Sequence, residues 1–178
     1  MKLTIHRGTH EIGGTCVELA TENTRILIDI GLPLVDEDGQ SFKLGNYFDL
    51  SKAELVEKKL AKDISGLYKE DKESKQPDAI LISHSHPDHY GLMPFVKSQI
   101  PLYLSEGCLE LIKATYYFRG LDPVFKTVEI VENKKCFSIG DFKITPYLVD
   151  HSGFDAYAFL IEAEGKRVFY SGDFRGHG

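Results

Sequence analysis

The chain has 178 residues, of which 42% are hydrophobic and 27% are charged, and its formal net charge is −6. This length is enough for one domain with a sizeable core, and the composition is ordinary for a globular protein in water. The negative charge neither suggests nor excludes electrostatic binding of nucleic acid by these residues alone, and bound divalent cations would reverse the local charge at a site.

Targeting signals and cysteines give a consistent expectation for the compartment. No hydrophobic stretch is long enough to span a bilayer, and residues 1–6 lack the hydrophobic centre of a signal peptide. Cys16, Cys108 and Cys136 are far apart and odd in number, which favours reduced, packed thiols over disulfides. We therefore expect a cytoplasmic protein without membrane contact.

The first part of the chain predicts three strands and then a helix. The strands are expected at residues 2–6, 15–20 and 25–30, with a glycine-containing turn at 8–14. Residues 36–50 form a polar excursion with scattered aromatic side chains. Ser51-Lys52-Ala53-Glu54 has the form of a capping box and predicts an amphipathic helix to about Leu60. The mixed-charge run 69–75 is interpreted as a solvated loop.

The second part alternates strands with short helices. A buried strand at 79–83 precedes a histidine-rich loop, and a short helix is expected from about Tyr90 to Lys97. After a strand at 101–104, Ser105 can cap a helix whose hydrophobic residues recur at helical spacing. Four further strands are expected at residues 124–131, 142–149, 156–162 and 167–171. The pattern indicates one α/β (α+β) unit whose sheet is largely antiparallel or mixed.

The loop His84-Ser85-His86-Pro87-Asp88-His89 is the strongest functional signal in the sequence. Because His84 and His86 are two residues apart on extended backbone, both side chains can point the same way and bind one ion. Asp88 and His89 follow where the chain turns, so they can reach a second ion, and Pro87 stiffens the loop. Imidazole and carboxylate are the ligands of borderline metals such as zinc.

Further potential ligands follow other predicted strands. The strand at 25–30 contains Asp29 near its end, Asp150-His151 follows the strand at 142–149, and Asp173 follows the strand at 167–171. Ligand sites of α/β sheets gather at the carboxyl ends of strands, so we expect neighbouring strands to bring these side chains together. By themselves, His151 would be interpreted as a packed or capping histidine and Asp173 as a turn residue.

This set of ligands suits a pair of divalent ions. His84, His86 and His151 can bind one ion, Asp88 and His89 the second, and Asp173 can bridge the two through its two oxygens. Ions about 3.5–4 Å apart lower the pKa of a shared water and stabilise an oxyanion, which favours hydrolysis by metal-bound hydroxide. Zinc is the expected metal and manganese the alternative, and Asp88 is assigned the catalytic role.

The remaining candidates carry less information. Asp29 is interpreted in two ways, as a hydrogen-bonding support of the histidine loop or as a turn residue. His6 and His10 are expected to have no catalytic role, and His177 is not assigned as a ligand although it lies close to Asp173 in the sequence.

The sequence resembles the metallo-β-lactamase superfamily. The His84-x-His86-x-Asp88-His89 loop, His151 and Asp173 match its first three metal motifs in order, and Glu11-Ile12-Gly13-Gly14 and Leu27-Ile28-Asp29-Ile30-Gly31 are also similar to it. The resemblance implies an αββα sandwich, incomplete here, with the first half and a few strands within residues 1–178. His151-Ser152-x-x-Asp155 and Ser171-Gly172-Asp173-Phe174-Arg175 resemble the ribonuclease J and β-CASP branch, which implies hydrolysis of RNA phosphodiesters.

One departure from the family pattern leads to further expectations. The family places another metal-binding histidine downstream of the bridging aspartate, whereas this sequence stops at Gly178, five residues after Asp173, and His177 is not assigned to that role. We therefore expect a truncated domain with little turnover, and an exposed sheet surface that causes self-association. Two alternatives stay open: a thioesterase, glyoxalase-type or β-lactamase-type hydrolase of the same fold, and a metal-binding module without activity.

Overall fold

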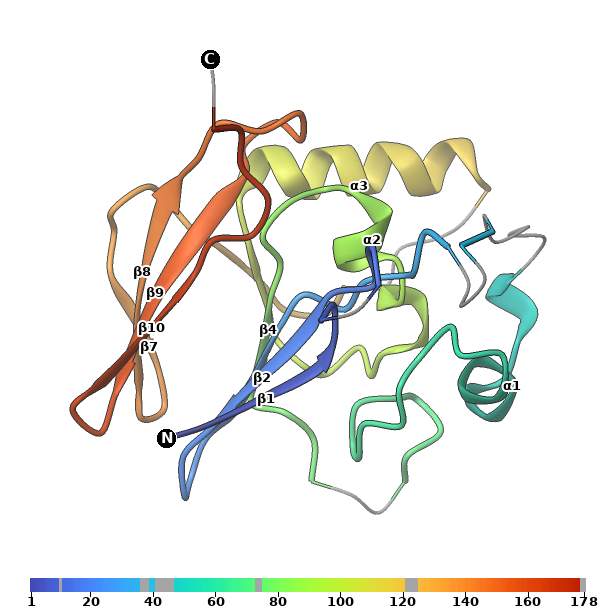
Figure 1. Ribbon diagram of the computed structural model, residues 1–178, viewed down its shortest axis with the longest axis horizontal. Helices are drawn as coiled ribbons and strands as arrows, with labels where there is room; N and C mark the ends of the chain where they lie inside the picture. Colours follow the sequence, from blue (N-terminus) through green and yellow to red (C-terminus); the bar gives the residue numbers. More distant parts are fainter. Residues whose placement is uncertain (10, 36–38, 41–46, 73–74, 121–124, 177–178) are drawn as a thin grey trace.

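Two β-sheets pack face to face, and helices lie on the outer face of one of them (Figure 1). This computed structural model describes residues 1–9, 11–35, 39–40, 47–72, 75–120 and 125–176. Within those ranges no helix is long and hydrophobic enough to cross a membrane. The expected mixed α/β fold is confirmed, and the described part of the sandwich has three layers: helices, a first sheet and a second sheet.

The first sheet has the order β1-β2-β3-β4-β5-β6. Its strands are Lys2–Arg7, Cys16–Ala20, Arg25–Ile28, Ala79–Leu81, Leu102–Leu104 and Val128–Ile130, from β1 to β6. The pairs from β1 to β3 are antiparallel and the pairs from β3 to β6 are parallel. Strand β4 is buried on both faces, which explains why its sequence is uniformly hydrophobic rather than alternating.

The second sheet is antiparallel throughout and has the order β10-β9-β8-β7. Its strands are Phe137–Ile139, Phe142–Leu148, Tyr157–Ala163 and Lys166–Tyr170, from β7 to β10. Strand β7 was not predicted. It forms a tight hairpin with β8 across Gly140-Asp141, where Gly140 adopts a positive φ of 50°.

The helices are α1 (Lys52–Glu57), α2 (Pro87–Tyr90) and α3 (Glu106–Phe118), with 3₁₀ turns η1 (Tyr47–Asp49) and η2 (Met93–Phe95). The predicted capping box of α1 is present, and Ser105 caps α3 by accepting a hydrogen bond from the Cys108 amide at 3.2 Å. Helix α1 ends earlier than expected because Lys59 has a positive φ of 56° and the Leu60 amide donates to the Leu55 carbonyl.

The prediction of a helix from about Tyr90 to Lys97 is wrong. Helix α2 begins at Pro87, before the predicted start, and ends at Tyr90. The Leu92 amide donates to the Ile30 carbonyl at 3.0 Å, and Pro94 has no amide hydrogen with which to continue a helix. Part of the excursion at 36–50 lies outside the described residues, as do parts of the strand expected at 124–131 and of the loop at 69–75.

Two hydrophobic clusters hold these layers together. One lies between the first sheet and the helices and includes Leu55 of α1 and Ile112 of α3, both fully buried. The other fills the space between the sheets and includes Ile28 of β3 and Phe159 of β9. Strands β3, β4, β8 and β10 end at the same end of this sandwich, so the loops that follow them meet there. The candidate ligands therefore follow strands of two packed sheets, whereas we had expected neighbouring strands to bring them together.

Candidate metal centre

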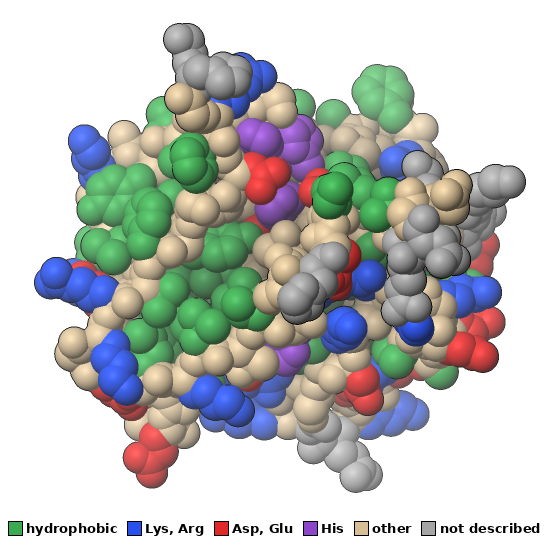
Figure 2. Space-filling view, in the orientation of Figure 1, with side chains coloured by type: hydrophobic (Ala, Val, Ile, Leu, Met, Phe, Trp, Pro, Cys, Tyr) green, Lys and Arg blue, Asp and Glu red, His purple; other side chains and the backbone are tan. Residues whose placement is uncertain are grey.

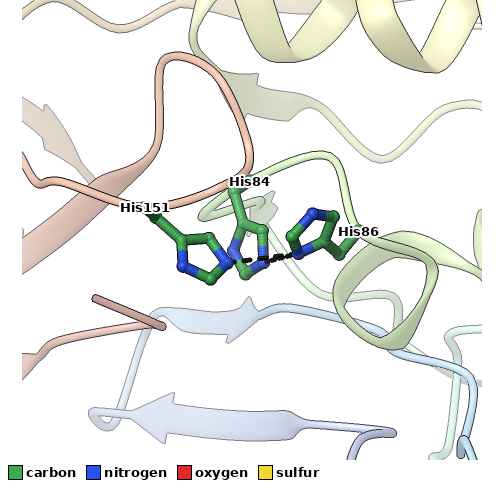
Figure 3. A group of neighbouring side chains, drawn as sticks. All are labelled: His84, His86 and His151. Atoms are coloured by element: carbon green, nitrogen blue, oxygen red, sulfur yellow. Dashed lines mark hydrogen bonds between the residues drawn. The ribbon is translucent and has the colours of Figure 1, made fainter. Parts of the chain in front are cut away.

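Three histidine side chains converge at this end of the sandwich (Figure 3). Nε2 of His84 and Nε2 of His151 each lie 3.1 Å from Nδ1 of His86. The His84 side chain is fully buried, whereas the other two are partly exposed. Three imidazole nitrogens thus face a common point that is open to solvent on one side.

Local sequence explains how the histidine loop is oriented. His84 follows the buried strand β4, and His86 is the N-cap residue of α2 with extended backbone, φ −86° and ψ 141°. Pro87 occupies the first helical position, where its missing amide hydrogen costs nothing. The chain therefore changes from strand to helix within the loop. His84 and His86 precede helix α2, and Asp88 and His89 lie in it.

His151 comes from the connection between β8 and β9. The Val149 amide donates to the Ala156 carbonyl at 3.0 Å and closes the base of this loop. The Tyr157 amide donates to the Ser83 carbonyl at 2.9 Å, which joins the second sheet to the residue preceding His84. Backbone bonds thus hold the two ligand-bearing loops side by side, although they are far apart in the sequence.

A second group of side chains surrounds His89. Its Nε2 atom lies 3.6 Å from a carboxylate oxygen of Asp88 and 3.6 Å from one of Asp173. The other oxygen of Asp173 lies 3.8 Å from Nε2 of His151. Asp173 therefore lies between the two groups, and its role as a bridging carboxylate stays a prediction.

Asp29 lies behind the histidines and is fully buried. Its carboxylate accepts hydrogen bonds from the Ser83 amide at 2.8 Å, the Ser83 hydroxyl at 2.7 Å, Nδ1 of His89 at 2.7 Å and the Tyr170 hydroxyl at 2.5 Å. Asp29 also has a positive φ of 58°, as a turn residue would. Both interpretations of Asp29 therefore hold, since the turn directs its carboxylate at the histidine loop.

Burial and the Asp29 charge set the protonation of the two buried histidines. Burial, followed by the neighbouring charge of His89, lowers the pKa of His84 to about 3. Burial disfavours the protonated form of His89, but the charge of Asp29 and its hydrogen bond raise the pKa of that imidazole to about 9. Burial likewise opposes ionisation of Asp29, yet His89 and the bonds from Ser83 and Tyr170 hold its pKa below the usual value.

The donor atoms fit a divalent metal. Zinc binds imidazole nitrogen at about 2.0–2.1 Å, so tetrahedral ligands lie about 3.3 Å apart, close to the contacts between these rings. The Ser83 hydroxyl donates to Asp29 and lies 3.0 Å from Nδ1 of His84, so it can accept a hydrogen bond there and leave Nε2 free to bind. Among the residues that the structure describes, two sets of three side chains bring ligand atoms within 4.8 Å of one another: His84, His86 and His151, and His84, His89 and Asp173.

The structure thus places every candidate ligand of the sequence in one region: His84, His86, Asp88, His89, His151 and Asp173. Ser83 and Tyr170, which hold Asp29, were not predicted. A serine before a histidine motif and a tyrosine at a strand end carry no distinctive signal in one sequence. His6 lies apart on β1, where Nε2 contacts Glu18 at 3.2 Å, and His10 and His177 lie outside the described residues.

Comparison with known proteins reveals a family match. A family model described as a beta-lactamase superfamily domain matches residues 61–177. Ribonuclease J of Helicobacter pylori is 30% identical over 179 aligned residues, which cover 98% of this chain and 23% of that protein. The chain thus spans about a quarter of the length of this relative.

Solved structures show the same fold at low sequence identity. A protein of unknown function from Enterococcus faecalis has a TM-score of 0.79 and 22% identity, covering 97% of this chain and 43% of that one. A metallo-beta-lactamase fold protein from Bacillus subtilis has a TM-score of 0.57 and 14% identity, covering 96% of this chain and 62% of that one. These likenesses concern the arrangement of strands and helices that positions the candidate site.

Proposed function

Because the chain belongs to the metallo-β-lactamase superfamily of hydrolases and is ribonuclease J-like, we propose that it provides the metal site of an enzyme that hydrolyses RNA phosphodiesters. The observation that carries this proposal is the convergence of His84, His86 and His151 beside the group formed by His89, Asp88 and Asp173. Residues 1–178 would then be one part of the catalytic domain of a longer protein.

Each side chain has a defined role in this proposal. His84, His86 and His151 would hold one divalent ion, Asp88 and His89 would hold a second, and the two carboxylate oxygens of Asp173 would be available to both. Zinc is the expected metal, with manganese as the alternative for the same donor atoms. When bound, the ions supply Lewis acidity that activates water and stabilises negative charge on the substrate.

The protein's own groups prepare this site. Asp29 accepts a hydrogen bond from Nδ1 of His89, which leaves Nε2 directed at Asp88 and Asp173. We assign the catalytic role to Asp88, whose side chain is 14% exposed and whose carboxylate would accept a proton from attacking water. Asp173 is half exposed, so substrate can approach from its side of the site.

The proposed substrate is RNA. Ribonuclease J of Helicobacter pylori matches nearly the whole of this chain, which supports a phosphodiester over a thioester or a lactam. The chain has a net charge of −6, so attraction of the RNA backbone must come from the bound cations or from residues beyond these 178.

Hydrolysis of four substrates tests this assignment in a longer protein that contains the chain. Zinc-loaded and manganese-loaded enzyme are given a single-stranded RNA, a chromogenic phosphodiester, a thioester and a cephalosporin. We expect cleavage of the RNA and the phosphodiester, loss of that cleavage on adding a chelator, and its return with metal. Preferential cleavage of the thioester or the cephalosporin would assign the site to another branch of the superfamily.

The isolated chain of 178 residues is expected to show little turnover, because it spans only 23% of ribonuclease J. Robust cleavage of the phosphodiester by this chain alone would contradict that expectation. Metal content by mass spectrometry separates a site that binds without turnover from one that does not bind at all.

Self-association is proposed from the exposed sheet surface. Strands β1 and β10 end their sheets in the described residues, and Leu3, Ile5 and Phe169 on these strands are 46%, 48% and 60% exposed. Figure 2 shows a broad hydrophobic area on this face, and the group of histidines lies beside it. Exposed hydrophobic strand edges favour pairing with a second copy. Sedimentation velocity should reveal dimers, and a monodisperse monomer that binds no hydrophobic dye would contradict this expectation.

A further inference from the structure

The loop that carries His151 is attached to helix α3 through Asp155. The Asp155 carboxylate accepts a hydrogen bond from the Gly107 amide in the first turn of α3 at 3.0 Å. The Asp155 carbonyl accepts a second bond from the Ser105 hydroxyl at 2.7 Å, and Ser105 also caps the helix. One residue of the loop is thus bound through both its side chain and its backbone.

The contact between the loop and the helix is close. A methyl group on Gly107 would lie 2.7 Å from Cβ of Asp155 and 2.7 Å from ring atoms of Phe154. These distances are too short for carbon atoms without a movement of the loop or the helix. The absence of a side chain at Gly107 therefore allows the loop to lie against the helix.

The same loop lies directly against the histidine cluster. A methyl group on Gly153 would lie 3.0 Å from Cδ2 of His84 and 3.5 Å from Cδ2 of His151. Between Gly153 and the helix contact there is only Phe154, and Asp155 has a positive φ of 59°, which directs the chain back toward β9. Since three residues, 152–154, separate Asp155 from His151, we expect a displacement at Asp155 to shift the ring of His151.

We propose that Asp155 is a positioning residue, which sets the metal affinity of the three-histidine site by fixing the His151 loop on the first turn of α3. The inference rests on the proposed metal site and adds to it a residue that touches no metal ligand atom. Asp155 acts through two properties: a carboxylate oxygen that accepts from Gly107, and a tolerance of positive φ that most residues lack.

Three substitutions of Asp155 separate these properties. Asp155→Asn keeps an acceptor oxygen and a side chain that tolerates positive φ, Asp155→Gly keeps only the φ, and Asp155→Ala keeps neither. Asp78→Ala is the matched control, because Asp78 also accepts a backbone hydrogen bond, from Arg25 at 2.7 Å, but lies at the other end of β4. Gly107→Ala tests the same contact from the helix side while retaining Asp155.

The experiment titrates each purified, metal-free chain with Co²⁺ and records the affinity and the visible absorption spectrum, which reports the ligand geometry. We expect Asp155→Ala and Asp155→Gly to weaken binding about tenfold or more and to alter the spectrum, as loss of a support for a metal ligand does. Asp155→Asn and Asp78→Ala should resemble the wild type, and Gly107→Ala should weaken binding like Asp155→Ala.

Hydrogen exchange of the metal-free chains provides a second measurement that needs no bound ion. Asp155→Ala should accelerate exchange of the Gly107 and Val149 amides and leave that of the Ile28 amide in β3 unchanged. Wild-type affinity, spectrum and exchange in Asp155→Ala would overturn the positioning role while the metal site stands. Failure of the wild type to bind Co²⁺ would overturn the metal site and this role together.

Discussion

Asp29 accepts a hydrogen bond from Nδ1 of His89 at 2.7 Å, and this contact joins the end of β3 to helix α2. Nε2 of His89 is thereby directed toward Asp88 and Asp173. Because the Asp29 carboxylate is also bound to Ser83 and Tyr170, it cannot turn away without breaking several contacts. The orientation of His89 is therefore fixed before any metal binds, as is common for histidine ligands.

Substitution Asp29→Asn is expected to lower metal affinity about 10- to 100-fold, the usual cost of losing a partner behind a metal-bound histidine. Asparagine keeps the shape and tolerates the positive φ of this position, but it removes the negative charge that increases electron density on His89. Competition with a chromogenic chelator measures the affinity. Tyr170→Phe is the control, because it removes one donor to Asp29 and leaves the bond from His89 in place. An unchanged affinity in Asp29→Asn would contradict the supporting role of Asp29.

Substitution His86→Ala is expected to lower the bound metal sharply, because Nδ1 of His86 is the atom that both other histidines approach. His6→Ala is the matched control, since His6 contacts Glu18 on the first sheet and belongs to neither metal group. Mass spectrometry of chains loaded with zinc and then desalted gives the stoichiometry. Equal zinc content in His86→Ala and the wild type would refute the ligand assignment.

Substitution Asp173→Ala should affect the second ion more than the first. The three histidines remain after this change, whereas Nε2 of His89 loses one of the two carboxylates that lie 3.6 Å from it. We expect the first ion to be retained and the second to bind more weakly. Because the Asp173 side chain is half exposed, the free energy of unfolding should change by no more than about 0.5 kcal/mol. Calorimetric titration resolves the two binding steps, and equal weakening of both would show that Asp173 belongs to one shared site.

Sequence patterns predicted those elements that have strong local signals. Ser51 and Ser105 mark helix starts through side-chain capping, and both caps are present. Boundaries were missed where tertiary contacts decide them: Leu92 donates to Ile30 across the fold, so no helix continues from α2. The hairpin at Gly140-Asp141 had a recognisable turn signal, but β7 is only three residues long and was overlooked.

The candidate ligands could be predicted because histidine and aspartate clusters at strand ends are rare without a function. The way in which the two sheets bring them together could not be predicted, since it depends on which ends of two separate sheets meet. His151 lies in a loop of the second sheet, and the bond from Tyr157 to Ser83 that places it beside His84 involves only backbone atoms. Asp155 was visible as part of a motif, whereas its contact with Gly107 required the position of α3.

Gly31 provides a test of how closely the loop that carries Asp88 and His89 packs against the end of β3. A methyl group at this position would lie 1.6 Å from the Asp88 carbonyl oxygen, which itself accepts a hydrogen bond from the Thr15 amide at 3.1 Å. Both neighbours are backbone atoms, so no side-chain rotation can relieve the overlap. The loop can approach this closely only because position 31 is glycine.

Substitution Gly31→Ala is therefore expected to destabilise the metal-free chain by about 3 kcal/mol, the upper part of the usual range for overpacking. It should also weaken metal binding, because helix α2, which carries Asp88 and His89, must move away from β3. Gly176→Ala is the matched control, since a methyl group there has no neighbour within 4 Å, and its effect should stay within about 0.5 kcal/mol. Urea unfolding followed by circular dichroism measures both values. Equal urea midpoints for the two variants would mean that the loop does not pack on Gly31 in solution as it does in the structure.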